Sequence, residues 1–141
     1  MLELREFVPE DAEAICPDAV DETLRGDPDY WRNWAKINAE RGPGYTAFYE
    51  GRPIGAAGIR LLDDNAACPW LVMTVEAASH KKMVMRTIRT MLKILIDEFG
   101  IKKLVTDSRK GFEASQRLLE HLGFRKMTIE TDTQYFYSME F

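Results

Sequence analysis

The chain has 141 residues, of which 45% are hydrophobic and 30% are charged, which is typical of one soluble domain, so we expect residues 1–141 to form a single unit. Its formal net charge of −4 at pH 7 argues against a nucleic-acid partner, because such proteins present clustered cations to the phosphates. The first residues lack the apolar run of a secretory signal, and no stretch approaches the roughly 20 apolar residues of a membrane span, which indicates a cytoplasmic protein without a membrane partner.

The first half of the chain predicts a strand, two helices and a hairpin. Apolar residues over 2–7 indicate a short strand, and Pro9 then opens a helix, because proline is tolerated in a first turn. Pro28 marks a second helix start and is followed by an apolar stripe at helical spacing. Residues 44–62 predict two strands that turn at Gly51, where glycine supplies the positive φ of a tight turn.

The second half predicts strands and helices in alternation. The apolar run CPWLVMTV, residues 68–75, is expected to be a central strand that is buried on both faces. Apolar residues recur at helical spacing over 82–99, which predicts a long helix. A short strand over 102–108, a helix over 112–122 and a terminal strand over 134–141 complete the pattern.

Three local patterns, taken with this order of elements, resemble the GNAT superfamily of acyl-CoA-dependent N-acetyltransferases. They are LREFVPEDAEAI, FYEGRPIGAAGIRLL and ASQRLLEHLGFRK, and they follow the family's order over nearly the whole chain. The resemblance implies an α/β (α+β) fold, with a mixed, mostly antiparallel sheet, a splayed pair of central strands and about four flanking helices. In this chain the splayed strands would be residues 71–75 and 104–106.

The resemblance also implies that acetyl-CoA is the cofactor. Its pantetheine arm would pair with the main chain of the fourth strand, at Met73, Thr74 and Val75. In the family, a Gln/Arg-x-x-Gly-x-Gly/Ala loop at the next helix start binds the pyrophosphate, because free N–H groups and the helix dipole attract an anion. Counting back from Gly100 places this loop, with the residue after it, on His80, Lys81, Lys82, Met83, Val84, Met85 and Arg86.

Methionine stands at both glycine positions of that loop, Met83 and Met85. No realignment restores the motif, because no glycine lies between Gly58 and Gly100. We therefore expect weak binding of acetyl-CoA. A basic row on the same helix opposes this loss, since its residues fall on one face: Lys82, Arg86, Arg89 and Lys93. The row is either part of a site for a phosphate-bearing ligand or an ordinary solvated face.

Two roles in proton transfer have candidate residues. Glu76 follows the fourth strand and would act as the general base, although a solvated carboxylate at a strand end is an equal alternative. Many family members place a tyrosine where this chain has Leu119, to protonate the leaving thiolate. Tyr135 or Tyr137 of the last strand is the candidate substitute, the alternative being that these aromatic residues belong to the core.

Acidic residues cluster where family members bind the acceptor amine. They either attract a cationic acceptor or form a polar connecting loop: Asp18, Asp21, Glu22, Asp27 and Asp29. Cys16 and Cys68 lack the spacing of a metal site or a redox motif, so neither a metal nor a disulfide is expected.

Two functions follow from these patterns. The first is an N-acetyltransferase that acts on a small-molecule or protein amine. The second is a non-catalytic GNAT-like protein, because residues 70–124, with the basic pattern MRTIRTML, also resemble GNAT-like proteins of tailed phages and prophages. In that case phage structural proteins would be the partners and the virion the location.

Overall fold

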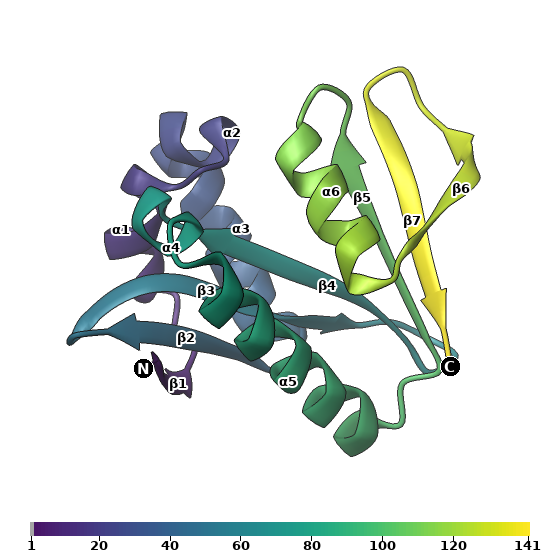
Figure 1. Ribbon diagram of the computed structural model, residues 1–141, viewed down its shortest axis with the longest axis horizontal. Helices are drawn as coiled ribbons and strands as arrows, with labels where there is room; N and C mark the ends of the chain where they lie inside the picture. The colour runs from purple at the N-terminus through teal and green to yellow at the C-terminus, as the bar shows by residue number, and fades with distance from the viewer. Residues whose placement is uncertain (1) are drawn as a thin grey trace.

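The computed structural model describes residues 2–141, which form a seven-stranded sheet with helices on both faces (Figure 1). The strands are β1 (Leu2–Glu6), β2 (Gly44–Tyr49), β3 (Arg52–Leu61), β4 (Ala66–Met73), β5 (Lys103–Arg109), β6 (Arg125–Glu130) and β7 (Gln134–Glu140). The helices are α1 (Asp11–Ile15), the 3-10 turn η1 (Cys16–Asp18), α2 (Glu22–Gly26), α3 (Pro28–Arg41), α4 (Val75–Ala78), α5 (Lys81–Phe99) and α6 (Glu113–Leu122). None of the helices within residues 2–141 has the length and apolar character needed to cross a membrane.

The sheet is mixed, in the order β1-β2-β3-β4-β5-β7-β6. Neighbouring strands are antiparallel except β4 and β5, which are parallel and pair only at Ala66 with Lys103 and at Ala67 with Leu104. Beyond these two pairs β4 and β5 diverge, and Figure 1 shows the open wedge between them. The predicted mixed, mostly antiparallel sheet with a splayed central pair is therefore confirmed.

Both faces of β4 are covered, as its apolar sequence predicts. Trp70 and Val72 belong to a core cluster with α1, α2 and α3, whereas Ala67 belongs to a second cluster with α5 on the opposite face. Helix α5 presents a buried row to this second cluster: Ile88, Met91, Leu92 and Leu95. Its C-terminal cap is Gly100, which has a φ of 62°, in the left-handed region that glycine adopts without strain. The fold therefore rests on two layers of core, one on each side of β4.

Four expectations from the sequence are corrected by the structure. Strand β4 ends at Met73 and not at residue 75, because the Thr74 hydroxyl accepts a hydrogen bond from the Ala77 N–H (3.2 Å) and begins α4. That helix was not expected, and neither was β6, whose side chains are mostly exposed. The first predicted helix is divided into α1, η1 and α2, so six helices flank the sheet instead of about four.

Candidate functional site

The open edge of β4 is the first feature of the site. The Thr74 N–H donates to the carbonyl of Ile54 in β3 (2.9 Å), so this N–H points toward β3. Successive residues of a strand direct their N–H groups to alternate edges, so those of Leu71 and Met73 face the wedge. Because β5 pairs with β4 only at its start, the N–H groups of Leu71 and Met73 have no strand partner there.

The three β4 residues expected to bind pantetheine therefore differ in position. Met73 lies on the open edge, Thr74 is already bonded to β3, and Val75 is the first residue of α4. Leu71, which the sequence analysis did not select, shares the open edge with Met73. The alternation of strand edges would have identified Leu71 once the pairing of Thr74 was known.

A short segment closes the wide end of the wedge. The Val20 N–H donates to the carbonyl of Met73 on β4 (2.9 Å). From β5, the Arg109 guanidinium donates to the Thr23 hydroxyl (2.7 Å) and to the Asp21 carboxylate (3.3 Å). We call residues 19–23 the cross-strap, because they bond to both splayed strands. Arg109 was not identified from the sequence, since its partners lie 86 and 88 positions away.

The N-terminus of α5 is the second feature of the site. The first helical hydrogen bond runs from the Val84 N–H to the His80 carbonyl (3.0 Å), which leaves the N–H groups of Lys81, Lys82 and Met83 without an intrahelical acceptor. The His80 side chain makes no capping hydrogen bond, and the first turn contains no acidic residue. Free donors and the positive end of the helix dipole therefore converge at a place where an anion is stabilised.

The predicted basic row lies on the exposed face of α5. Lys82, Arg86 and Lys93 are exposed, and none of them pairs with a carboxylate among residues 2–141. Arg89 donates to the carbonyl of His121 at the end of α6 (3.2 Å), so the row borders the gap between α5 and α6 (Figure 1). Met83 and Met85 are half-buried in the first turns of α5, beside the free N–H groups.

The two candidate catalytic residues are not brought together. Glu76 lies in α4 and forms an ion pair with Arg52 at the start of β3, and this hydrogen bond and charge raise the pKa of Arg52. Tyr135 lies in β7, with the ammonium groups of Lys126 and Lys110 at 3.9 Å and 5.0 Å from its ring centroid. Glu76 therefore faces the β2–β3 hairpin, while Tyr135 lies beyond β5 on the other side of the wedge (Figure 1).

Two buried hydroxyl groups lie on the β5–β7 side of the wedge. Tyr137 is fully buried and Ser108 is 4% exposed, and neither hydroxyl has a hydrogen-bond partner among residues 2–141. Burial raises the pKa of Tyr137. Ser108 is the register partner of Tyr135, so it is diagonal to Tyr137 across the two strands. Leu119 packs against the same cluster, which supports the core interpretation for Tyr137.

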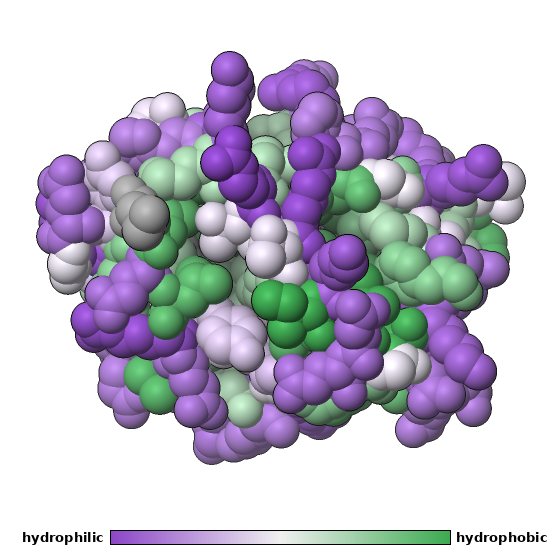
Figure 2. Space-filling model, turned by 60° about the horizontal axis from the view of Figure 1, so that its bottom comes forward, coloured by the Kyte–Doolittle hydropathy of each residue, from purple (hydrophilic) through white to green (hydrophobic). Residues whose placement is uncertain are grey.

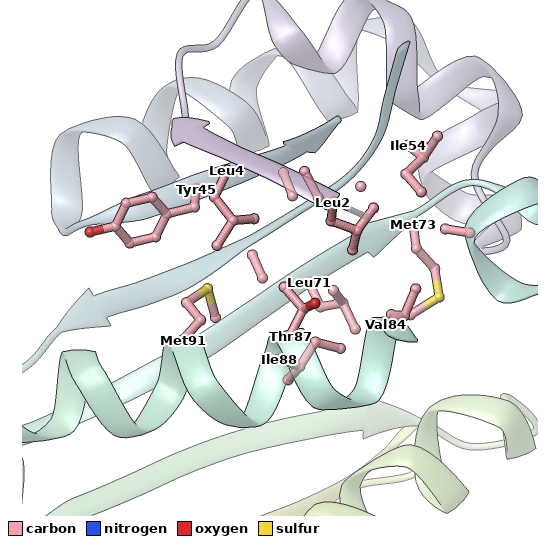
Figure 3. A pocket seen from close by; sticks show the side chains of 15 residues that line it. Leu2, Leu4, Tyr45, Ile54, Leu71, Met73, Val84, Thr87, Ile88 and Met91 are labelled. Atoms are coloured by element: carbon pink, nitrogen blue, oxygen red, sulfur yellow. The ribbon is translucent and has the colours of Figure 1, made fainter. Parts of the chain in front are cut away.

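Two hollows flank β4. The first is a small apolar groove of about 40 Å³ between α5 and the strands β1 to β4 (Figure 3). Figure 2 shows apolar side chains, in green, in the middle of this side of the molecule, with hydrophilic side chains, in purple, around them. Figure 3 shows the side chains of Leu2 and Leu4 of β1 on one side of this groove and those of Val84, Thr87 and Met91 of α5 on the other. This groove lacks the polar groups that acyl transfer requires.

The second hollow has a volume of about 550 Å³ and lies at the C-terminal end of β4. It is lined by Ala14, Pro17, Asp18, Arg25, Arg52, Pro53, Thr74, Val75 and Glu76. We call it the β4-end hollow.

Most residues of the predicted acidic cluster have structural partners. Asp21 caps α2 through the Thr23 N–H (2.9 Å), and Asp27 caps α3 through the Tyr30 N–H (3.2 Å). Glu22 lies 3.7 Å from Arg25. Asp21, Glu22 and Asp27 therefore have capping or pairing roles within the fold. Only Asp18 of the five lines the β4-end hollow.

Both cysteines are free thiols. Cys16 is completely buried in η1, and Cys68 is partly buried in β4. Burial, followed by the charges of Asp21 and Glu13, raises the pKa of Cys16 to about 11. Within residues 2–141, no group of three or more His, Cys, Asp or Glu side chains is arranged to hold a metal ion.

Comparison with known proteins gives one family match. Residues 1–125 match the model of the acetyltransferase (GNAT) domain family. A search of curated protein sequences finds no match.

Solved structures with the same fold cover almost the whole chain. A putative phosphinothricin N-acetyltransferase has a TM-score of 0.74 at 21% identity, over 99% of this chain and 98% of that one. The ribosomal-protein-S18-alanine N-acetyltransferase of Escherichia coli has a TM-score of 0.70 at 19% identity, over 99% and 94%. The N-acetyltransferase PseH of Campylobacter jejuni, solved in complex with acetyl coenzyme A, has a TM-score of 0.67 at 11% identity, over 99% of both chains. At these identities the likeness concerns the fold alone.

Proposed function

The chain belongs to the GNAT acetyltransferase family, and on that basis we propose that it binds acetyl-CoA in the β4–β5 wedge and transfers the acetyl group to an amine. The observation that carries this proposal is the pair of unpartnered donor groups described above. They are the open edge of β4 at Leu71 and Met73 and the uncapped N-terminus of α5 at Lys81, Lys82 and Met83.

The residues present fit the cofactor in part. The free N–H groups of α5 suit a pyrophosphate, and Lys81, Lys82 and Arg86 add positive charge. The side chains of Met83 and Met85 occupy space that glycine leaves open, so the phosphates approach the main chain less closely. Losing two or three charge-assisted hydrogen bonds at about 1.5–3 kcal/mol each weakens binding by several powers of ten. We therefore propose a dissociation constant in the micromolar-to-millimolar range.

Acetyl-CoA, when bound, supplies a thioester carbonyl that an amine nitrogen attacks. The N–H groups of Leu71 and Met73 would hold the pantetheine amide and orient the carbonyl against β4. Glu76 is engaged by the ion pair with Arg52, so Glu76 is not a free general base for the acceptor amine. The amine then has to lose its proton to water, and the rate is expected to rise with pH.

The ion pair between Glu76 and Arg52 also favours a second function, which is contact with another protein without catalysis. Glu76 is engaged by Arg52, methionines replace both glycines, and Leu119 stands at the tyrosine position. These losses agree with the resemblance of residues 70–124 to GNAT-like phage and prophage proteins. A protein of that kind would act by contact with phage structural proteins in the virion or its assembly. An absence of acetyl-CoA binding to the folded chain favours this second function.

The direct test compares three forms of the chain by calorimetric titration with acetyl-CoA. Met83→Gly with Met85→Gly removes the side chains and adds backbone freedom, whereas Met83→Ala with Met85→Ala removes most of the bulk and keeps the helix. If the side chains obstruct the phosphates, both variants bind at least tenfold more tightly than the parent. The parent's affinity is expected to fall as salt rises, because exposed cations supply it.

Two results contradict this proposal. Nanomolar binding by the parent means that the methionines are no obstacle. Tighter binding by the glycine variant alone means that backbone freedom, and not space, limits the site. Transfer is tested by release of free thiol from acetyl-CoA in the presence of an amine.

A further inference from the structure

The β4-end hollow contains four charged side chains that the proposed cofactor site does not use. Arg25 comes from α2, Arg52 from the start of β3, Asp18 from η1 and Glu76 from α4. Four elements thus bring two guanidinium groups and two carboxylates to one open hollow of about 550 Å³, and Ala14 of α1 also lines it. Cavities of roughly 300–1,000 Å³ are the usual size of small-molecule sites.

The charges of the hollow are balanced but not fully paired. Arg52 pairs with Glu76, and its second carboxylate neighbour, Glu50, is 3.7 Å away. Arg25 donates to the carbonyl of Ala19 (3.2 Å) and lies 3.7 Å from the exposed Glu22. Asp18 has no ion pair among residues 2–141. The hollow therefore offers guanidinium donors to an anionic group and a free carboxylate to a cationic one.

This arrangement selects a class of ligand. A polyamine would meet two arginines, and a polyanion would meet two carboxylates, so each would face repulsion. A zwitterion satisfies both signs, because a planar guanidinium matches a carboxylate and an ammonium group matches Asp18. The remaining wall is formed by Thr74 and four apolar residues, and its apolar part suits an apolar side chain: Ala14, Pro17, Pro53 and Val75.

We propose that the β4-end hollow binds an α-amino acid with an apolar side chain, as the acceptor of the transfer. Its role as acceptor rests on the proposed function, whereas the binding does not. The hollow lies at the C-terminal end of β4, where Thr74 in its wall follows Met73 directly. In the transfer the bound ammonium first loses one proton to solvent, and the free amine nitrogen then bonds to the acetyl carbon. The carbon–sulfur bond breaks, and the second amine proton passes through solvent to the sulfur. The products are an N-acetyl amino acid and the thiol of CoA.

The product lacks the positive charge that Asp18 recognises. An N-acetyl amino acid should therefore bind the hollow more weakly than the amino acid does, which favours its release. The same reasoning applies to any ligand that carries only one of the two charges.

Calorimetric titration without acetyl-CoA tests the binding with four matched probes. They are L-leucine, 3-methylbutylamine, 4-methylpentanoate and N-acetyl-L-leucine. Of these, 3-methylbutylamine lacks the carboxylate and 4-methylpentanoate lacks the amine. L-leucine is expected to bind at least tenfold more tightly than the other three. Arg25→Met and Asp18→Asn should each weaken the binding of L-leucine about tenfold, the effect of losing one charged contact of about 1.4 kcal/mol. Glu40→Gln, at an exposed position of α3 outside the hollow, is the control and should leave the binding unchanged.

Equal affinity for the four probes overturns the proposal, and so does unchanged binding by a folded Asp18→Asn variant. Thermal melting of each variant shows that it is folded, and Asp18→Asn decides the question if Arg25→Met is not. Detection of N-acetyl-L-leucine by mass spectrometry, with acetyl-CoA bound, supports the acceptor role, and its absence overturns that role. If acetyl-CoA does not bind while L-leucine still does, the proposed function fails and the assignment of the hollow stands.

Discussion

The cross-strap gives a prediction about the wedge that needs no ligand. Replacing Arg109 by methionine keeps the bulk of the side chain and removes two hydrogen bonds, to the Thr23 hydroxyl (2.7 Å) and the Asp21 carboxylate (3.3 Å). Because Asp21 also caps α2, the matched second change is Thr23→Val, which leaves the capping N–H in place. The pair of changes therefore isolates the bond that joins β5 to the cross-strap.

The expected magnitude follows from the exposure of the groups. The side chains of Arg109 and Asp21 are 39% and 28% exposed, so solvent screens this ion pair, which contributes at the level of about 0–1 kcal/mol. The hydrogen bond to Thr23 adds about 1 kcal/mol. Arg109→Met should therefore lower the free energy of unfolding by about 1–2 kcal/mol, and at about 3 °C per kcal/mol this lowers Tm by about 3–6 °C.

A double-mutant cycle on thermal unfolding measures the coupling of Arg109 to Thr23. We expect a coupling of about 0.5–1.5 kcal/mol, together with faster amide hydrogen exchange in residues 19–23 of the Arg109→Met protein. Additive effects of the two changes, with no change in exchange in the cross-strap, would refute the conclusion that Arg109 closes the wedge.

Three further predictions concern the core. Gly58→Ala should lower the free energy of unfolding by about 1–3 kcal/mol, because a Cβ there would come within 2.7 Å of the Gly44 Cα and 2.8 Å of Trp70 Cζ2. Gly26→Ala is the control, because a Cβ there would have no atom within 4 Å. An equal Tm for the two variants contradicts this packing. Tyr137→Phe should raise Tm, since it removes a buried hydroxyl without a partner, and a fall in Tm would reveal a partner such as a water molecule. Cys16, whose pKa is raised to about 11, should resist iodoacetamide at pH 8 in the native protein, because its thiol stays protonated. The folded pKa lies above the ordinary value of 9.0, so the contribution of this thiol to stability is complete below pH 9 and is lost as the pH rises toward 11. Rapid native-state alkylation of Cys16, detected by mass spectrometry, is the contrary outcome.

The sequence predicted elements whose signal is local. The long helix expected over 82–99 matches α5 (Lys81–Phe99) in all but its first residue, because its buried face repeats at helical spacing and Gly100 ends it. Strand β4 was extended too far because the apolar run continues through Thr74, whose hydroxyl begins a helix. Strand β6 was missed because it lies at the edge of the sheet and buries little, so its six residues include only two apolar ones, Met127 and Ile129.

The candidate site was predicted only in part, for a physical reason. Free N–H groups at the start of α5 follow from the position of the helix, and the sequence located them. The ion pair of Glu76 with Arg52 and the bonds of Arg109 to the cross-strap join residues that are far apart in the chain. Such pairs depend on the tertiary structure and have no local signature.

The central claim is that acetyl-CoA binds in the wedge, and a titration of the ¹⁵N-labelled parent chain followed by amide NMR tests it most directly. We predict fast-exchange shifts that centre on the N–H groups of Leu71 and Met73 on β4 and of Lys81, Lys82 and Met83 on α5, with a dissociation constant in the micromolar-to-millimolar range that rises with salt. Shifts confined to other surfaces, or no shifts at millimolar acetyl-CoA, would contradict the account.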